Sequence, residues 1–108
     1  MLFRSAGIYR NASALRQAEA ELQQLQERFR DVAVEDHSYT FNTELTAVLE
    51  LSYMLDLAQV IVGSAFHRQE SRGSHQRTDY PERDDRKFLA HSVASRTGDG
   101  LPDRKSVV

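Results

Sequence analysis

The sequence predicts a mainly α-helical fold: a three-helix bundle, spectrin-repeat-like, whose first helix is truncated, followed by a C-terminal β-hairpin or extended tail. Two observations predict this fold. From Leu15 onward, apolar residues recur at spacings of three and four, which is typical of one face of a helix. Most of the few glycines and both prolines lie after residue 72, so the chain divides into a helical part and a looser tail.

Length and composition limit the possible classes of protein. The 108 residues correspond to one domain, and 40% hydrophobic residues suffice for a small core. A net charge of −2 gives no general attraction to nucleic acid or anionic lipid. The absence of cysteine excludes disulfides and a Cys nucleophile, and it fits a cytosolic compartment. Glu50 and Asp56 interrupt the most apolar stretch, so we expect no membrane-spanning segment.

Residues 1–10 are short and apolar, and they are interpreted either as the stub of a longer first helix or as a frayed terminus. Asn11 is a suitable N-cap for a helix over residues 11–32. The seam of that helix consists of Leu15, Ala18, Leu22, Leu25, Phe29 and Val32. So short a seam indicates packing inside a small bundle rather than an extended coiled coil.

Residues 42–72 predict one long helix, capped by Asn42, with Phe41 packing onto its first turns. Its apolar residues surround much of the circumference: Leu45, Val48, Leu49, Leu51, Leu55, Val60, Ile61, Val62, Ala65 and Phe66. The helix over residues 11–32 and the stub can cover only part of this surface. The excess of apolar surface predicts a partner.

Residues 73–108 form the tail. Gly73 is placed to close the preceding helix with a positive φ. Residues 87–96 partly alternate in hydrophobicity, residues 97–100 carry a turn signal, and residues 104–108 can return as a second strand. We therefore predict a β-hairpin. The chain stops in mid-strand on Val107 and Val108, which we interpret, like the abrupt start at Met1, as a cut end.

No residue pattern predicts an active site. The four histidines lack metal-ligand spacing, no glycine-rich phosphate loop precedes a helix, and Ser71 and Ser74 lie near His75 without an orienting acid. The basic cluster near residues 68–77 suits the negative end of a helix dipole, and the acidic run that follows opposes RNA binding. We expect no catalytic, cofactor-binding or metal-binding residue here, and no nucleic acid as a partner.

The candidate functional residues are instead contact residues. They are Glu70, Arg72, Gly73, His75, Arg77, Asp84 and Asp85. We expect Arg72 or Arg77 to pair with Asp79, Asp84 or Asp85, and so to fold the tail back onto the helix end or to contact a neighbouring domain. Gly73 would permit the turn.

Residues 66–85 resemble the C-terminal helical domain of the flavoprotein subunit of fumarate reductase and succinate dehydrogenase. The strongest motifs are RQESRGSHQR at residues 68–77, YPERDD at residues 80–85 and FLAHS at residues 88–92, and they are joined by GIYR at residues 7–10, LQQLQERF at residues 22–29 and FNTEL at residues 41–45. All of them follow the family's order. The aspartate oxidase flavoproteins share ESRG, the following histidine and an Asp-Tyr-Pro, so the equivalent domain of that family is an alternative. The motifs at residues 82–85 and 88–92 favour fumarate reductase.

The resemblance implies a structural and docking domain. The parent enzyme would interconvert fumarate and succinate with FAD and exchange electrons with an iron–sulfur subunit. In that family, FAD is held by a dinucleotide-binding domain, and the dicarboxylate site lies between that domain and a capping domain. Neither segment occurs in this sequence, so we expect this chain to bind no FAD and to be inactive by itself.

The implied partners are the FAD and capping domains of the same subunit and the iron–sulfur subunit, with membrane contact only through anchor subunits. The implied location is cytoplasmic, on the inner face of the cell membrane. Fumarate reduction, as in anaerobic respiration, and succinate oxidation, as in the tricarboxylic acid cycle, are not distinguished. The alternative from another class is a free-standing helical oligomerisation module, for which the excess apolar surface would be a homo-oligomer interface.

Overall fold

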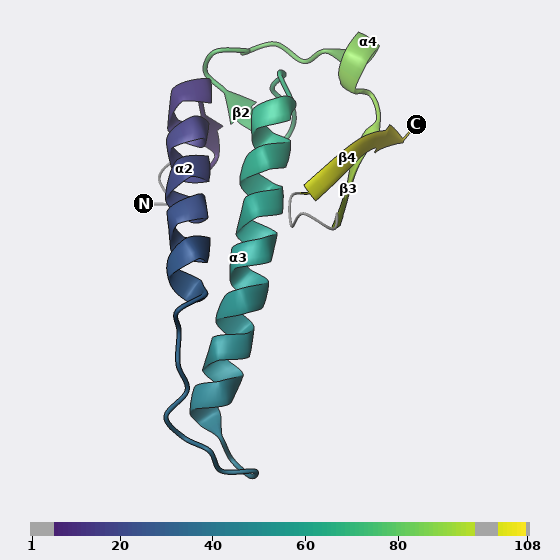
Figure 1. The fold of residues 1–108 in the computed structure, drawn as a ribbon. Coiled ribbons are helices and arrows are strands. Elements are labelled where there is room, and N and C mark those ends of the chain that lie inside the picture. Colours follow the sequence, from purple (N-terminus) through teal and green to yellow (C-terminus); the bar gives the residue numbers. More distant parts are fainter. Residues whose placement is uncertain (1–5, 97–101, 108) are drawn as a thin grey trace.

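The computed structural model describes residues 6–96 and the backbone of residues 102–107. Its elements are β1 (Tyr9–Arg10), α2 (Ala12–Phe29), α3 (Thr43–His67), β2 (Gln76–Arg77), α4 (Asp85–Phe88), β3 (His91–Arg96) and β4 (Pro102–Val107). The two long helices, α2 and α3, form an antiparallel hairpin, and the tail crosses the end at which α2 begins and α3 ends (Figure 1). The predicted mainly helical fold with a strand-bearing tail is confirmed.

The core lies between α2 and α3. Its buried apolar residues are Leu15, Ala18 and Leu22 from α2 and Leu55, Val62 and Ala65 from α3. A polar contact extends this interface, because Gln26 Nε2 donates to Gln59 Oε1 at 3.0 Å. The predicted seam over residues 15–32 is fully buried only at Leu15, Ala18 and Leu22, since Leu25 and Val32 remain 40% and 44% exposed. The core therefore occupies the end of the hairpin that carries the tail.

Asparagine side chains start both long helices, as predicted. Asn11 Oδ1 accepts from the N–H of Ala14 at 2.8 Å, and Asn42 Oδ1 accepts from the N–H of Leu45 at 2.9 Å. The predicted helix over residues 11–32 ends earlier, at Phe29. The predicted hydrophobic staple at Phe41 is wrong, because this side chain is 99% exposed. Phe41 has a φ of 53°, which directs the chain away from the first turns of α3.

The predicted helix over residues 42–72 is too long, because α3 ends at His67 and Arg68 adopts extended backbone angles. A group from the tail terminates it. The Arg77 guanidinium donates from Nη1 to the carbonyl oxygens of Ala65 and Phe66, at 3.0 and 2.9 Å. These carbonyls belong to the last turn, where no helical N–H is available to them.

The predicted helical stub over residues 1–10 is wrong for its described half. Residues 6–8 are irregular, and Tyr9–Arg10 form strand β1, which pairs in parallel with β2. The N–H of Gln76 donates to the carbonyl of Ile8 at 3.0 Å, and that of Thr78 donates to the carbonyl of Arg10 at 2.8 Å. This segment therefore uses its carbonyls to hold the tail. Residues 1–5 lie outside the described residues.

The predicted hairpin is confirmed in the pairing of β3 with β4, which is antiparallel from His91↔Val107 to Arg96↔Pro102. Its first strand begins at His91 instead of Lys87, because residues 85–88 form helix α4. Asp84 caps that helix by accepting from the N–H groups of Arg86 and Lys87, both at 3.1 Å. The turn signal at residues 97–100 lies outside the described residues.

The surface of α3 is unusually apolar for a helix so little covered. Its most apolar 18-residue window has a mean hydropathy of 1.6, enough by length and composition to cross a membrane, and only 17% of that window is buried. Every such window within Thr43–His67 contains both Glu50 and Asp56. α2 therefore covers one side of α3 and leaves much of its apolar surface exposed.

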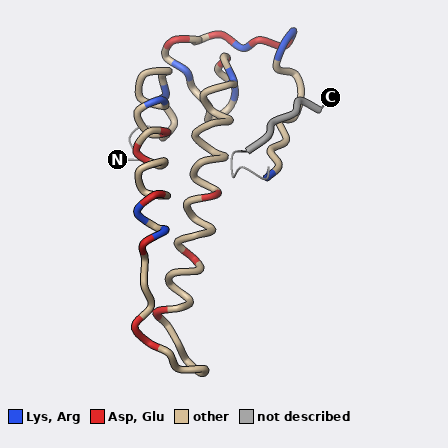
Figure 2. The backbone as a smooth tube through the Cα atoms, viewed as in Figure 1, with Lys and Arg blue, Asp and Glu red and all other residues tan. Residues whose placement is uncertain are grey.

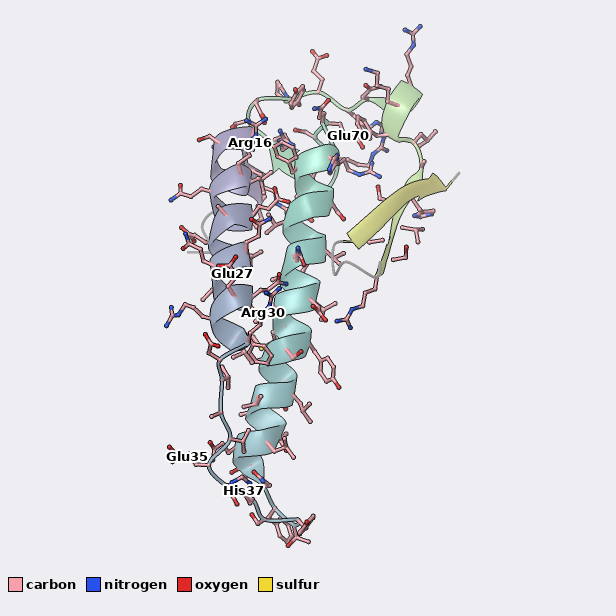
Figure 3. All side chains as sticks on the ribbon, viewed as in Figure 1. Arg16, Glu27, Arg30, Glu35, His37 and Glu70 are labelled. Atoms are coloured by element: carbon pink, nitrogen blue, oxygen red, sulfur yellow. The ribbon has the colours of Figure 1, made fainter. Side chains whose placement is uncertain are left out.

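The two ends of the α2–α3 hairpin differ in charge. Residues 31–66 contain no Lys or Arg, and their acidic residues are Asp31, Glu35, Asp36, Glu44, Glu50 and Asp56. This segment includes the connecting loop and almost all of α3, and its charged positions in Figure 2 are all acidic. Glu35 and His37 lie at the far tip of the hairpin, whereas Glu70 lies at the opposite end, beneath the tail (Figure 3).

Candidate functional site

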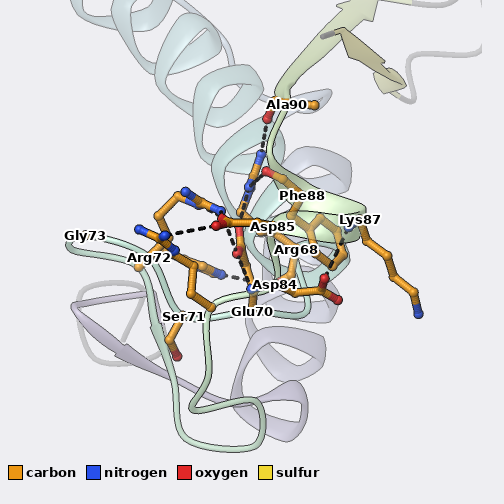
Figure 4. Close-up of polar contacts among 12 residues, drawn as sticks. Arg68, Glu70, Ser71, Arg72, Gly73, Asp84, Asp85, Lys87, Phe88 and Ala90 are labelled. Atoms are coloured by element: carbon orange, nitrogen blue, oxygen red, sulfur yellow. Dashed lines mark hydrogen bonds and ion pairs between the residues drawn. The ribbon is translucent and has the colours of Figure 1, made fainter.

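Glu70 is the centre of a polar cluster that joins the end of α3 to the tail. Its carboxylate is fully buried, and it accepts from Arg72 Nε and Nη2 at 3.0 and 3.2 Å and from the backbone N–H of Asp84 at 2.9 Å. Arg68 Nη1 donates to the same carboxylate. Arg72 also reaches Asp85, so one guanidinium connects two carboxylates (Figure 4). Arg68, Glu70, Arg72 and Asp85 thus each have a partner of the opposite sign.

Arg68 extends this cluster toward the β3–β4 hairpin. Its guanidinium donates to the carbonyl oxygens of Phe88 and Ala90, at 2.9 and 2.7 Å, and lies 5.5 Å from the centroid of the Phe88 ring. One side chain therefore contacts both α4 and the residues that lead into β3. This arrangement fixes where the last part of the tail leaves the helix end.

Arg77 and Asp79 form a second polar centre on the other side of the α3 terminus. Arg77 is 2% exposed, and it donates from Nε and Nη2 to the two oxygens of Asp79, at 2.8 and 2.7 Å. Asp79 Oδ2 also accepts from the backbone N–H of Ala12, the first residue of α2, at 3.1 Å. Cation and anion thereby face the helix ends that attract them.

His75 lies between strand β1 and the end of α3. Its Nδ1 is 2.8 Å from Arg10 Nη1, and its Nε2 is 3.0 Å from the carbonyl oxygen of Arg68. Because a guanidinium can only donate, Nδ1 must accept, and Nε2 must carry the proton that is donated to the carbonyl. The geometry therefore selects a neutral imidazole with its proton on Nε2.

A two-residue turn and a buried serine shape the loop that carries these groups. Arg72 and His75 exchange backbone hydrogen bonds of 2.8 and 3.0 Å around the pair Gly73 and Ser74. Gly73 has a φ of 56°, as predicted, although it lies in this two-residue turn and not at the helix end. Ser71 is buried; its hydroxyl accepts from the N–H of Arg77 at 2.9 Å and donates to the carbonyl of Tyr80 at 2.8 Å.

The electrostatics of the cluster favour ionised carboxylates. Burial alone would raise the pKa of Glu70, but hydrogen bonds from Arg72, Asp84 N–H and Arg68 outweigh it and lower this pKa to about 2. The hydrogen bonds from Arg77 are the main cause that lowers the pKa of Asp79 to about 2. Burial lowers the pKa of His75, and its arginine neighbours lower it further.

An open pocket of about 500 Å³ lies beside this cluster, lined by Arg68, Arg72, His75 and residues 88–92. Its two arginines donate to Glu70, Asp85 and backbone carbonyls. Ser71 and His75 are each bonded to other groups, so they form no nucleophile–base pair. In residues 6–96, no group of three His, Asp or Glu side chains is placed to hold a metal ion. The cluster holds backbone segments together.

The structure separates the seven candidate residues into three groups. Glu70, Arg72, Asp84 and Asp85 meet in one cluster, Arg77 lies in the second centre, and Gly73 and His75 lie on the loop between them. Sequence reasoning did not select Arg68 or Asp79, which supply the contacts to α4 and α2. Their signal was present, because Arg68 belongs to the basic cluster and Asp79 was an expected partner of Arg77.

Comparisons with known proteins match nearly the whole chain to one family of flavoprotein subunits. A family model described as "Fumarate reductase flavoprotein C-term" matches residues 1–105. The chain is 58% identical over 96 residues to the fumarate reductase flavoprotein subunit of Mycobacterium tuberculosis, and the match covers 89% of this chain and 16% of that protein. It is 36% identical over 89 residues to the succinate dehydrogenase flavoprotein subunit of Rickettsia bellii, covering 82% of this chain and 15% of that protein.

A solved structure of E. coli quinol fumarate reductase, a mutant in its flavoprotein chain FrdA, superposes with a TM-score of 0.93 at 39% identity. This alignment covers 98% of the present chain and 18% of the other. The chain thus spans about one-sixth of the length of the curated relatives it matches.

Proposed function

The chain belongs to the fumarate reductase flavoprotein C-terminal family, and on that premise we propose that it is the structural and docking domain of a flavoprotein subunit. The whole subunit interconverts fumarate and succinate with FAD and passes electrons to or from an iron–sulfur subunit. The domain itself supplies surfaces for the FAD and capping domains of that subunit and for the rest of the complex. It works on the cytoplasmic side of the membrane, to which anchor subunits attach the complex.

The observation that carries this proposal is a row of exposed apolar side chains along α3. Its members are spaced four residues apart: Leu45, Leu49, Tyr53, Leu57 and Ile61, with exposed fractions between 44% and 62%. Residues at this spacing form one of the ridges by which helices pack into the grooves of other structures. A contiguous apolar ridge in water favours burial against a partner.

The total surface supports the same conclusion. A compact monomer of 12.3 kDa has an accessible area of about 6,100 Å². This chain exposes 8363 Å². The excess of roughly 2,000 Å² on this one chain is larger than the about 800 Å² that one partner buries in a standard protein–protein interface.

FAD binding is assigned to segments of the subunit outside this domain. The pyrophosphate of a dinucleotide needs a glycine-rich turn that leads from a strand into a helix. Here Gly73, the positive-φ glycine of the described residues, lies in a two-residue turn that follows a helix. The residues of this domain therefore do not fit the cofactor, and we derive no step of the reaction from them.

The polar clusters have a supporting role in this proposal. Glu70, Arg72, His75, Arg77, Asp84 and Asp85 hold the tail on the end of the helical hairpin, and Gly73 permits the turn between them. The contacts of Glu70 and Arg77 support this role, because each joins segments that are distant in the sequence. A tail fixed in this way would present one constant surface to neighbouring domains.

A test compares two double variants of the full-length flavoprotein subunit. Leu49→Ser with Leu57→Ser removes the centre of the row, and we expect it to reduce strongly the yield of assembled complex. Leu25→Ser with Leu89→Ser makes the same chemical change at exposed leucines outside α3, and we expect it to leave the yield unchanged. Equal yields for both would refute the docking role. If the isolated chain forms a discrete dimer that the first variant converts to a monomer, the oligomerisation module is correct instead.

A further inference from the structure

The loop between α2 and α3 carries two aromatic side chains that are exposed to solvent. Tyr39 and Phe41 are 104% and 99% exposed. Burial of each ring would be favourable, because an aromatic side chain buries roughly 150–250 Å² of surface at an interface. A loop that served only as a connection would be expected to carry polar residues at these positions.

The loop around these rings is held in one shape. Glu44 accepts from the N–H groups of Glu35 and Asp36, at 2.9 and 3.1 Å. The side-chain amide of Asn42 donates to the carbonyl oxygens of Asp36 and Ser38, at 2.8 and 3.2 Å. Aromatic side chains on a fixed loop lose little conformational freedom when a partner binds, which is the property of an anchor residue.

The backbone at Phe41 adds to this picture. Its φ of 53° lies in the left-handed region that a bulky residue avoids. Directly after it, the N–H of Thr43 donates to the carbonyl of Phe41 at 3.0 Å, which closes a tight turn on Asn42. Local strain thus occurs at a residue whose side chain is almost fully exposed, a combination typical of binding segments.

Charge indicates the chemistry of the partner. Residues 31–66 carry six carboxylates and no Lys or Arg, whereas the remaining residues carry 14 Lys and Arg against 10 Asp and Glu. The two aromatic rings therefore sit on an acidic end of the molecule. Such a surface repels anionic lipid and nucleic acid, and it attracts a surface that presents Lys and Arg.

We propose that the tip formed by residues 31–44 is a second docking surface, in which Tyr39 and Phe41 insert into an apolar depression lined by Lys and Arg on a protein partner. This inference deepens the proposed function, since the partner belongs to the complex in which the domain resides. The tip extends beyond the row on α3, whose first member, Leu45, directly follows Glu44. Glu35 and His37 lie at the end of the α2–α3 hairpin opposite the tail (Figure 3). The rings supply affinity, and the carboxylates supply orientation and rate of association.

The test places a photo-crosslinking amino acid at position 39 or 41 of the full-length subunit in its native complex. Position 23 is the control, because Gln23 is exposed on α2. We expect cross-links from the tip, identified by mass spectrometry, to a peptide in which Lys and Arg outnumber Asp and Glu, with a yield that falls as salt is raised. A yield no higher than at position 23, or cross-links to lipid, to RNA or to another copy of this chain, would overturn the proposal.

Two variants of the tip, together with one control on α2, separate the contribution of charge from that of packing. Glu35→Lys reverses a charge at the tip, and Glu27→Lys makes the same change on α2, where Glu27 is exposed. We expect the first to reduce the yield from position 39 several-fold and the second to leave it unchanged. Tyr39→Ser with Phe41→Ser should lower the affinity of the subunit for this protein partner by at least about tenfold. If cross-linking fails while the Leu49 and Leu57 variant still impairs assembly, the tip proposal falls and the proposed function stands.

Discussion

The guanidinium of Arg77 and the carboxylate of Asp79 meet through two parallel hydrogen bonds, of 2.8 and 2.7 Å, between the end of α3 and the start of α2. The arginine also donates to two carbonyls of the last turn of α3, and the aspartate accepts from the first N–H of α2. One ion pair thus caps both long helices and sets the position of the segment that leads from the end of α3 into the tail.

Arg77→Lys should destabilise the chain almost as much as Arg77→Ala, by about 3 kcal/mol, or roughly 15 °C in Tm for a domain of this size. The reason is geometric, because an ammonium group cannot donate in parallel to Asp79 and also reach Ala65 and Phe66. Thermal unfolding followed by circular dichroism measures the loss. A double-mutant cycle with Asp79→Asn should return a coupling above about 1 kcal/mol; additive losses would contradict the capping role.

Glu70→Gln should cost about 3 kcal/mol of unfolding free energy, since it removes the buried anion with which the guanidinium groups of Arg68 and Arg72 pair. Glu82→Gln is a matched control, because Glu82 is exposed in the same tail, and it should change the stability by less than about 0.5 kcal/mol. Urea unfolding of the two variants checks this prediction. Similar midpoints for both would show that the buried carboxylate contributes little.

The sequence predicted those features that depend on neighbouring residues. Asn11 and Asn42 cap helices because an asparagine followed by helix formers is a local signal. The end of α3 could not be found in this way, because its cap is Arg77, which lies ten residues beyond His67. The Gly73 signal was real, since positive φ suits glycine, but the same signal fits a helix end and a two-residue turn.

The pairing of β1 with β2 was beyond sequence reasoning for a similar cause. Arg10 and Arg77 are register partners although 67 positions separate them, and two-residue strands show no periodicity. The burial of Glu70 was hidden because acidic residues are seldom fully buried. Only the flanking arginines at positions 68 and 72 could have indicated that this carboxylate has partners inside the fold.

Acid should destabilise the domain through Glu70 and Asp79. Both carboxyls have a folded pKa of about 2, below their ordinary values of 4.5 and 3.8. Between the folded and the ordinary pKa values, the unfolded chain binds more protons than the folded chain. The stabilisation from these two carboxylates is therefore complete above about pH 4.5 and is lost as the pH falls toward 2. Tm measured from pH 6 to pH 3 should fall steeply, and Glu70→Gln should flatten the slope. An equal slope in that variant would assign the acid sensitivity to other groups.

A second, milder pH dependence should come from His75. Its folded pKa lies below the ordinary 6.5, because burial and the cations Arg10, Arg77 and Arg68 disfavour the imidazolium. Its contribution to stability is therefore present above about pH 6.5 and declines as the pH falls through and below that value. Nitrogen-15 NMR should find the neutral tautomer protonated on Nε2. A tautomer protonated on Nδ1 would contradict the contact with Arg10.

The turn at Gly73 should tolerate added volume but not a changed φ. A Cβ built on Gly73 meets no atom within 4 Å, whereas its φ of 56° is one that side chains disfavour. Gly73→Ala should therefore cost about 1 kcal/mol from backbone strain alone. Gly73→Asn should cost less, because asparagine adopts left-handed angles more readily, and Gly73→Val should cost more because of its branched Cβ. This order in Tm separates strain from crowding, since crowding would make asparagine about as costly as valine.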